Sequence, residues 1–317
     1  MKVQTLMLIF MVFLAACQDT MVPGESYLSG DLTFKTQNQK FSIIEGELVT
    51  QSDPMSSHIV GVYENKEGQV CAGTLLKNNQ VLTAAHCVGA EMYLIFDQKF
   101  SENSLVRAVS QREIYPAYHV GKDDLIDTYD LALLKFEGDL PEGYAPAQLI
   151  SLELWQNYLK EIQEAPLKIT VAGFGFNQLE SKSGIGELRK TELIIEDWNQ
   201  NLFSAIADQK KGGAVCAGDS GGPAFIYIHG RPYLWAVTAH ALSVDESTDK
   251  AGKDASPCRY KSVFTQVLPF SEWIRGLLLP MSLVRTVTHV LDSAVISAQG
   301  AGISRSLTPQ SPSPQRK

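Results

Sequence analysis

Residues 218–223 read Gly-Asp-Ser-Gly-Gly-Pro, so that one serine, Ser220, lies in a glycine-rich turn directly after an acid. Glycine allows tight turns and lets peptide N–H groups approach a bound substrate closely. A serine hydroxyl held there can attack a carbonyl carbon, and nearby N–H groups can bind the oxyanion that forms. The stretch therefore predicts nucleophilic catalysis, provided that the chain also supplies a base, a carboxylate to orient that base, and a substrate pocket.

The composition is that of a folded globular protein. Of the 317 residues, 44% are hydrophobic and 20% are charged, and the formal net charge is −8. This length suits one domain of ordinary size or a two-lobed unit with a buried core. Because the chain is acidic and has no basic block, it is not expected to bind nucleic acid.

Residues 1–16 are predicted to be an export signal. Lys2 precedes an apolar run at residues 6–14, which is too short to span a membrane and suits the hydrophobic region of a signal peptide. The run ends in Leu-Ala-Ala followed by Cys17, which resembles a bacterial lipobox and implies that Cys17 is lipidated after cleavage. Gln18, in place of the aspartate that retains such lipoproteins in the inner membrane, favours the outer membrane. The alternative is a plain secretory signal with a chance cysteine.

The remaining cysteines form an even set. If Cys17 carries lipid, four are left, which is typical of an exported protein with disulfide bonds. These four are Cys71, Cys87, Cys216 and Cys258. Four cysteines allow three pairings, and cysteine arithmetic alone does not choose among them.

The chain after the signal changes character near Ile43. Residues 17–42 are polar and are interpreted as a linker or propeptide, and the last segment, residues 280–317, is expected to be a largely disordered tail. Between them, short strand-like runs alternate with turn residues, which predicts an all-β sandwich or barrel. These runs are residues 57–63, 80–83, 131–136, 167–172 and 233–238. Residues 152–164 suit a helix or a long loop, and residues 269–279 suit a short helix with Ser271 as its N-cap.

A base and an orienting carboxylate can be proposed from local context. Of six histidines, only His86 follows a run of small residues that could end a strand and present an imidazole. Cys87 could join this turn to Cys71, and a loop of that length contributes about 3 kcal/mol in the chain-entropy model. Asp130 precedes an apolar strand, where an acid is costly unless it is hydrogen-bonded. Accepting the imidazole N–H would satisfy Asp130 and leave the other nitrogen free as a base.

Three motifs together resemble the trypsin/chymotrypsin-like serine proteases. They are Thr83-Ala84-Ala85-His86-Cys87, Asp130-Leu131-Ala132-Leu133 and residues 218–223, in the order that this family uses. The resemblance covers the chain from Ile43 to about Arg275. It implies an all-β peptidase domain over residues 43–279. The expected fold is two six-stranded antiparallel β-barrels that divide near residue 150, with the active site between them and a short C-terminal helix.

The resemblance also implies the roles of the motif residues. His86 is the expected base, Asp130 orients it, and Ser220 is the nucleophile. The backbone N–H groups of Gly218 and Ser220 are the expected oxyanion hole. The implied disulfide bonds join Cys71 to Cys87 and Cys216 to Cys258, the second of which would brace the substrate pocket.

An activation step follows from the same resemblance. Ile43 would become a new N-terminus after cleavage, and its amine would pair with the buried Asp219. Residues 172–175 resemble the glycine-rich segment beside this site. The scissile bond would follow Ser42 rather than Lys or Arg, which argues against a trypsin-like activator. The alternative is that Ile43 merely begins a strand.

The expected pocket is apolar. Ala214 corresponds to the base of the family's specificity pocket, and neither it nor Val215 can supply the charge that holds Lys or Arg. Ala241 and Ser262 correspond to wall positions and would narrow the pocket. The expected substrates are proteins or peptides with small to medium apolar side chains at P1, the residue before the scissile bond.

Two positions depart from the family. Ala239 and His240 stand where the family usually has serine and tryptophan, which could weaken catalysis or narrow the substrate range. The leading interpretation is a serine endopeptidase without cofactor or metal. It is expected to be a monomer, exported and either secreted or lipid-anchored to the cell envelope through Cys17. The alternatives are a catalytically weak or inactive binding protein on the same scaffold and a structural surface lipoprotein.

Overall fold

The structure is a computed structural model of the 317-residue chain. The predicted export signal with Cys17, most of the predicted linker and the predicted tail lie outside the described residues. The described residues are 26–27, 43–119, 129–163, 165–175, 185–199, 203–209, 212–242, 258 and 260–278.

The first half of the described chain forms a closed antiparallel barrel of six strands. The strands run in the spatial order β7-β6-β3-β4-β5-β8, and pairing between β7 and β8 closes the ring. A two-residue strand, β1 (Ser26–Tyr27), adds to the outside of β7. The barrel strands are β3 (Ile59–Glu64), β4 (Gln69–Leu76), β5 (Gln80–Thr83), β6 (Met92–Phe96), β7 (Leu105–Ile114) and β8 (Ala132–Phe136).

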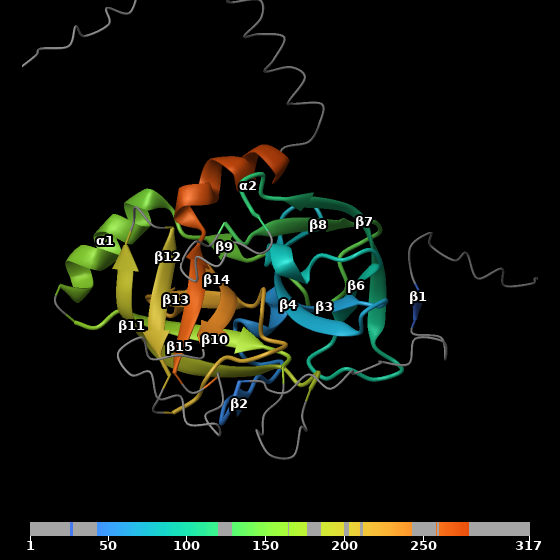
Figure 1. Ribbon diagram of the computed structural model, residues 1–317, viewed down its shortest axis with the longest axis horizontal. Helices are drawn as coiled ribbons and strands as arrows, with labels where there is room; N and C mark the ends of the chain where they lie inside the picture. Colours follow the sequence, from blue (N-terminus) through green and yellow to red (C-terminus); the bar gives the residue numbers. More distant parts are fainter. Residues whose placement is uncertain are drawn as a thin grey trace, which may run out of the picture.

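The second half forms another closed antiparallel barrel of six strands, beside the first (Figure 1). The order is β10-β13-β14-β15-β12-β11, and pairing of β10 with β11 closes this ring. Two short strands join from outside, β2 (Glu47–Leu48) on β11 and β9 (Gln148–Leu149) parallel to β14. The barrel strands are β10 (Lys168–Gly173), β11 (Arg189–Asn199), β12 (Ser204–Asp208), β13 (Pro223–Ile228), β14 (Arg231–Leu242) and β15 (Lys261–Gln266). The predicted fold is therefore confirmed.

The strands form where the sequence alternates β-branched and aromatic residues with turn residues. All six residues of β3 and all four of β5 are buried, as expected for strands that face the barrel interior on one side and packed neighbours on the other. The predicted run 57–63 begins too early, because residues 56–58 form a 3-10 turn, η1 (Ser56–His58). There His58 Nδ1 lies 2.7 Å from the Ala145 carbonyl oxygen.

The sequence left helix and loop open for residues 152–164. Within that range, Leu152–Ile162 forms the helix α1 at the outer side of the second barrel (Figure 1). Its N-cap is Ser151, whose hydroxyl accepts the Leu154 N–H at 3.1 Å. Trp155 is buried against Trp198 and Trp235, with ring centroids 5.2 Å and 5.8 Å apart. The helix therefore forms because a local cap and an aromatic contact act together.

The terminal helix α2 (Ser271–Leu278) differs from the prediction at its start. Ser271 is not an N-cap, because its φ of −57° and ψ of −35° are already helical. The helix continues directly from a 3-10 turn, η4 (Leu268–Phe270). Ser271 therefore lies inside a continuous helical segment and does not precede its first turn. At its other end, the Leu277 carbonyl accepts a hydrogen bond from Gln80 Nε2 at 2.8 Å, which ties α2 to the first barrel. No helix in the described part of the chain has both the length and the apolar character needed to cross a bilayer.

Replacing the α1 cap tests its contribution to stability. Ser151→Ala is expected to lower the free energy of unfolding by about 1 kcal/mol, because the Leu154 N–H loses its acceptor. Ser151→Asp keeps an acceptor and should retain most of that stability. Denaturant unfolding of the two variants and the parent checks this, and equal losses in both variants would show that the lost stability does not come from the hydrogen bond to the Leu154 N–H.

Candidate active site

His86 is held from two directions by one carboxylate. It lies in the short 3-10 helix η2 (Ala85–Cys87), which follows β5, and its side chain is 30% exposed. Asp130, buried just before β8, accepts the His86 backbone N–H at 2.9 Å and lies 2.6 Å from His86 Nδ1. Because an ionised carboxylate only accepts hydrogen bonds, Nδ1 carries the proton and Nε2 is left free to act as a base.

The charge of Asp130 also acts on a neighbouring phenol. Burial raises the pKa of Tyr118, and the negative charge of Asp130 raises it further. Tyr118 therefore stays protonated and neutral beside the carboxylate at neutral pH.

Ser220 lies at the junction of the two barrels. Its carbonyl oxygen accepts the N–H of Ala72 in β4 at 2.8 Å, and the next N–H, of Gly221, donates to the Thr238 carbonyl in β14 at 2.8 Å. Gly221 has φ +78°, and a Cβ there would lie 2.1 Å from Thr83 Oγ1. Only glycine fits this turn, which is packed between β4 and β5 on one side and β14 on the other.

The Ser220 and His86 side chains do not contact each other through a hydrogen bond in the described part of the molecule. Ser220 Oγ donates to the Ala239 carbonyl at 3.4 Å, and His86 Nε2 lies 3.7 Å from Cys87 Sγ. Nucleophile–base hydrogen bonds often form fully only when substrate is bound. The three predicted catalytic residues therefore lie in one region, with the His86–Asp130 pair formed and the serine turned to another acceptor.

Two peptide N–H groups beside Ser220 remain available as donors. Those of Gly218 and Ser220 take part in none of the backbone hydrogen bonds of the described residues. Gly218 has φ +94°, and a Cβ there would lie 2.6 Å from the Cα of Gly175. This geometry requires glycine and leaves both N–H groups able to stabilise negative charge on a substrate oxygen.

Asp219 is fully buried beneath the same turn. Its carboxylate accepts the N–H of Cys216 at 3.0 Å and that of Gly175 at 3.1 Å. Burial raises the pKa of Asp219 from 3.8 to about 8, and the two backbone hydrogen bonds offset this in part. No ion pair involves Asp219 within the ranges that the structure describes, so no cation there stabilises its ionised form.

The predicted partner of Asp219, Ile43, is buried in the uncut chain. No hydrogen bond joins Ile43 to Asp219 among the residues described. The following residue, Ile44, exchanges two backbone hydrogen bonds with Ala214, at 2.8 Å and 3.1 Å. The pairing of an Ile43 amine with Asp219 remains a prediction, and the structure places the segment that would make it against the predicted pocket base.

The predicted pocket residues lie on neighbouring segments. Ala214 and Val215 are buried, and Ala241 in β14 lies opposite Ser262 in β15. The hydroxyl of Ser262 is buried without a hydrogen-bond partner among the described residues. A bulge in β14 falls between Thr238 and His240, so Ala239, which is buried, has no residue directly opposite it in β15.

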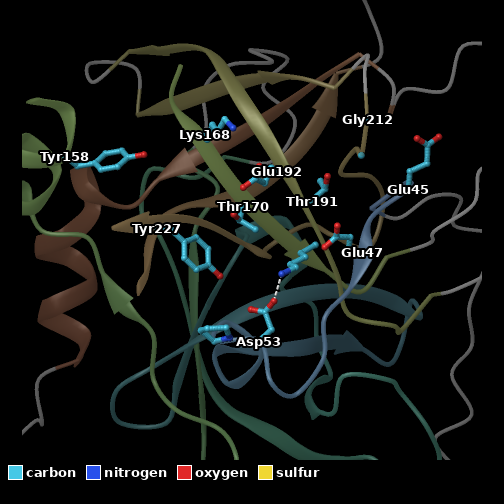
Figure 2. Close-up of a pocket in the computed structure, with 13 residues that line it drawn as sticks. Glu45, Glu47, Asp53, Tyr158, Lys168, Thr170, Thr191, Glu192, Gly212 and Tyr227 are labelled. Carbon is cyan, nitrogen blue, oxygen red and sulfur yellow. Dashed lines mark hydrogen bonds and ion pairs between the residues drawn. The ribbon is translucent and has the colours of Figure 1, made fainter. Parts of the chain in front are cut away.

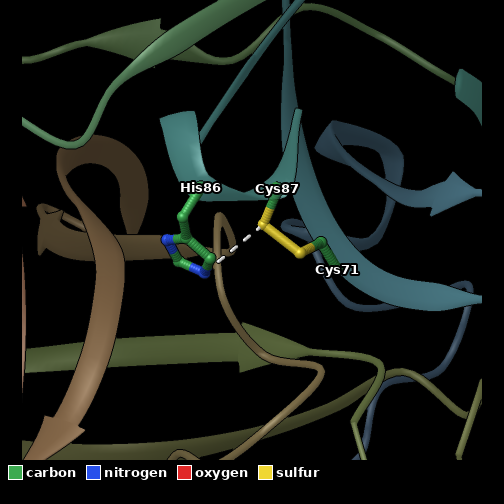
Figure 3. A group of neighbouring side chains, drawn as sticks. All are labelled: Cys71, His86 and Cys87. Atoms are coloured by element: carbon green, nitrogen blue, oxygen red, sulfur yellow. Dashed lines mark hydrogen bonds between the residues drawn. A yellow bond between two sulfur atoms is a disulfide. The ribbon is translucent and has the colours of Figure 1, made fainter. Parts of the chain in front are cut away.

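The structure contains both disulfide bonds that the family resemblance implies, Cys71–Cys87 and Cys216–Cys258. The first brings Cys71, His86 and Cys87 together, with their potential ligand atoms within 4.8 Å of one another (Figure 3). Metal ions bind thiolates, and both sulfurs here are consumed in the disulfide. The group is therefore unsuited to holding a metal, and the disulfide instead anchors the residue after His86 to β4.

A separate polar hollow of about 850 Å³ lies on the second barrel (Figure 2). None of the three predicted catalytic residues lines it. An ion pair between Lys190 and Asp53 crosses it, and burial together with the charge of Asp53 raises the pKa of Tyr227 to about 12. It is lined by Glu45, Glu47, Asp53, Pro54, Tyr158, Lys168, Thr170, Lys190, Thr191, Glu192, Gly212, Gly213 and Tyr227.

The family resemblance places residues 172–175 beside the activation site, but the sequence does not indicate the partners in three contacts of the site. The N–H of Gly175 binds Asp219, the N–H of Ala72 binds the Ser220 carbonyl, and the side chain of Gln209 binds the backbone of Val215. Backbone donors look alike in every sequence. An isolated glutamine after a strand is common on protein surfaces, so nothing in its neighbours indicates burial.

Comparisons with known proteins show similarity in sequence and in fold over most of the chain. Residues 47–274 match the family model described as Trypsin. Ovochymase of Halocynthia roretzi is 26% identical over 240 residues, and the match covers 70% of this chain but only 14% of ovochymase. Chymotrypsin-like elastase family member 1 of Homo sapiens is 25% identical over 233 residues, covering 66% of this chain and 81% of that protein. The solved structure of mouse neuropsin, a serine protease, shares the fold, with a TM-score of 0.54 and 21% identity over 75% of this chain and 100% of neuropsin.

The burial of Asp219 predicts a pH dependence of stability in the uncut chain. Because its folded-state pKa lies above the unfolded value, the folded chain holds a proton that the unfolded chain has released between about pH 4 and about pH 8. The stability contributed by neutral Asp219 is therefore present below about pH 4 and is lost as the pH rises through about 8. Denaturant unfolding of Ser220→Ala, which cannot digest itself, should show this loss relative to Ser220→Ala/Asp219→Asn. A difference between the two that does not change with pH would contradict it.

Proposed function

Because this chain belongs to the trypsin family of serine peptidases, we propose that it is a serine endopeptidase that hydrolyses peptide bonds through an acyl-enzyme. The single observation that carries the proposal is that Asp130 accepts two hydrogen bonds from His86, one from the ring nitrogen Nδ1 and one from the backbone N–H. A structural histidine needs no such orientation. A general base does, because one tautomer must be fixed with Nε2 facing the nucleophile.

The proposed reaction uses groups already present in the chain. Ser220 Oγ leaves the Ala239 carbonyl, transfers its proton to His86 Nε2 and attacks the substrate carbonyl carbon. The resulting oxyanion is bound by the N–H groups of Gly218 and Ser220. His86 then donates its proton to the leaving amine, and water, activated by the same imidazole, hydrolyses the acyl-enzyme and restores the serine. Asp130 stays ionised throughout and stabilises the imidazolium.

The proposed P1 preference is for small to medium apolar side chains. Ala214 and Val215 offer no carboxylate to a lysine or arginine, and Ala241 faces Ser262 across the β14–β15 pair. One relative of this chain bears elastase in its name, which accords with this preference. The substrates are proteins or peptides, and the proposed mechanism needs no cofactor.

Activation is proposed to follow cleavage between Ser42 and Ile43. The new amine of Ile43 would give the buried Asp219 the positive charge that it lacks among the described residues. Burying two charges as a pair is far less costly than burying one alone. The two disulfide bonds are typical of an exported protein. Export is proposed to use residues 1–16, with Cys17 as a lipid anchor on the cell envelope.

A second candidate function is a binding protein on the same scaffold with weak or no catalysis. Two observations favour it. Ser220 Oγ is turned to the Ala239 carbonyl rather than to His86, and Ala239 and His240 replace the serine and tryptophan usual in the resembled family. Both candidates predict the same fold, so only the reactivity of Ser220 separates them.

A fluorophosphonate probe tests the reactivity of the nucleophile. Protein that begins at Ile43 is expected to be labelled at Ser220, because His86 and the two N–H donors activate that hydroxyl. Ser220→Ala is the matched control and should not be labelled. Absence of labelling in correctly processed parent protein would favour the binding function and overturn the proposed activity.

A library of peptides that differ only at P1 tests the preference. Cleavage is expected after alanine, valine and leucine, since the pocket has no charged group at Ala214 or Val215. The kcat/KM for each peptide is the measurement. Dominant cleavage after lysine or arginine would show that the pocket has been assigned wrongly.

A further inference from the structure

The three consecutive residues at the predicted pocket base are each held by a different partner. Ala214 exchanges two backbone hydrogen bonds with Ile44, at 2.8 Å and 3.1 Å. Cys216 is joined to Cys258 by a disulfide and donates its N–H to Asp219 at 3.0 Å. The residue between them, Val215, pairs with no strand among the described residues and is held by a side chain.

That side chain belongs to Gln209, the residue directly after β12. Val215 N–H donates to Gln209 Oε1 at 3.1 Å, and Gln209 Nε2 donates to the Val215 carbonyl at 3.2 Å. The backbone N–H of Gln209 donates in turn to the Tyr260 carbonyl at 3.0 Å. Gln209 and Val215 are each only 1% exposed, so neither pair of groups has water as a substitute partner.

The paired contact is one that a neighbouring strand would make. In an antiparallel sheet, two opposed residues exchange both of their N–H···O=C bonds. A glutamine amide carries one carbonyl acceptor and an NH₂ donor, and it therefore reproduces that exchange from a side chain. Glutamate lacks the donor, and methionine, which has a similar length, lacks both strong hydrogen-bonding groups.

The position of Val215 matters because its two neighbours have separate tasks. Ala214 forms the predicted base of the P1 pocket, while Cys216 binds the carboxylate of Asp219, the residue before Ser220. A shift of the Val215 peptide would displace both. Gln209 itself touches no reacting atom, so any effect on catalysis must pass through this segment.

We propose that Gln209 is a positioning residue that sets the floor of the P1 pocket by holding the Val215 peptide as a neighbouring strand would. This inference rests on the proposed endopeptidase function and adds to it a determinant of specificity that lies outside the pocket itself. It implies that the preference among P1 side chains depends on a buried amide that no substrate contacts.

The test compares Gln209→Met with a matched control, Gln266→Met. Gln266 is a second buried glutamine of the same barrel, and its Nε2 donates to the Ser204 carbonyl at 2.9 Å, away from residues 214–216. The measurements are the Tm and the kcat/KM for two peptides with alanine or phenylalanine at P1. The P1 ratio is the kcat/KM for the alanine peptide divided by that for the phenylalanine peptide. Gln209→Met is expected to reduce this ratio by about tenfold, because small displacements of a binding surface have large kinetic effects. Gln266→Met is expected to lower the Tm and leave the ratio within about twofold of the parent.

A conservative variant keeps the test valid if Gln209→Met does not fold. In Gln209→Glu an ionised carboxylate cannot donate to the Val215 carbonyl, whereas a protonated carboxyl group can. The P1 ratio of Gln209→Glu is therefore expected to be reduced, as in Gln209→Met, at about pH 8 and to return toward the parent value as the pH is lowered. Dividing the ratio of the variant by that of the parent at the same pH removes the pH effects that both enzymes share, including any from Asp219, which binds the Cys216 N–H.

The outcomes separate the two hypotheses. If the parent reacts with the fluorophosphonate probe but neither Gln209 variant changes the P1 ratio, Gln209 is only structural and the inference is overturned while the proposed activity stands. If the processed parent neither reacts with the probe nor cleaves any peptide, the proposed activity fails and the inference fails with it. A changed ratio in Gln209→Met together with an unchanged ratio in Gln266→Met supports the inference.

Discussion

One hydrogen bond, from the Ala72 N–H of the first barrel to the Ser220 carbonyl, connects the two halves of the site. His86 and Asp130 belong to the first barrel, and Ser220 belongs to a turn that enters β13 of the second. The turn can approach β4 so closely only because Gly221 has no side chain. The relative position of the proposed base and the proposed nucleophile therefore depends on a backbone contact and a glycine rather than on their side chains.

Asp219 carries a second constraint, which acts beneath the same turn. A carboxylate without exposure to water is costly, and here it is held by the N–H groups of Cys216 and Gly175. Those contacts join the turn to the segment at residues 214–216, which Ile44 and Gln209 hold in place. The proposed substrate pocket, the proposed oxyanion donors and the proposed activation segment thus share one set of hydrogen bonds, and a change in one is expected to reach the others.

Much of the architecture could be predicted from short motifs. The all-β class followed from strand-like runs separated by turns, and the two closed barrels followed from the family resemblance; both agree with the structure. Predictions that depended on local geometry did less well. Ser271 is not a cap, because the preceding 3-10 turn runs into the helix, and the true capping serine, Ser151, was not singled out. A serine acts as an N-cap only if its own backbone lies outside the helical region, as that of Ser151 does at φ −91° and ψ 158°.

The sequence by itself predicted which side chains are available for chemistry, namely His86, Asp130 and Ser220, and determined that the proposed pocket base, Ala214, carries no charge. It could do so because these residue types are rare in such contexts and their order along the chain is informative. Only the tertiary structure decided what each one contacts: that Asp130 binds His86 twice, that Ser220 faces the Ala239 carbonyl, and that Gln209 takes the place of a strand. Those contacts join segments far apart in sequence, and the barrels bring them together through packing that no local pattern encodes.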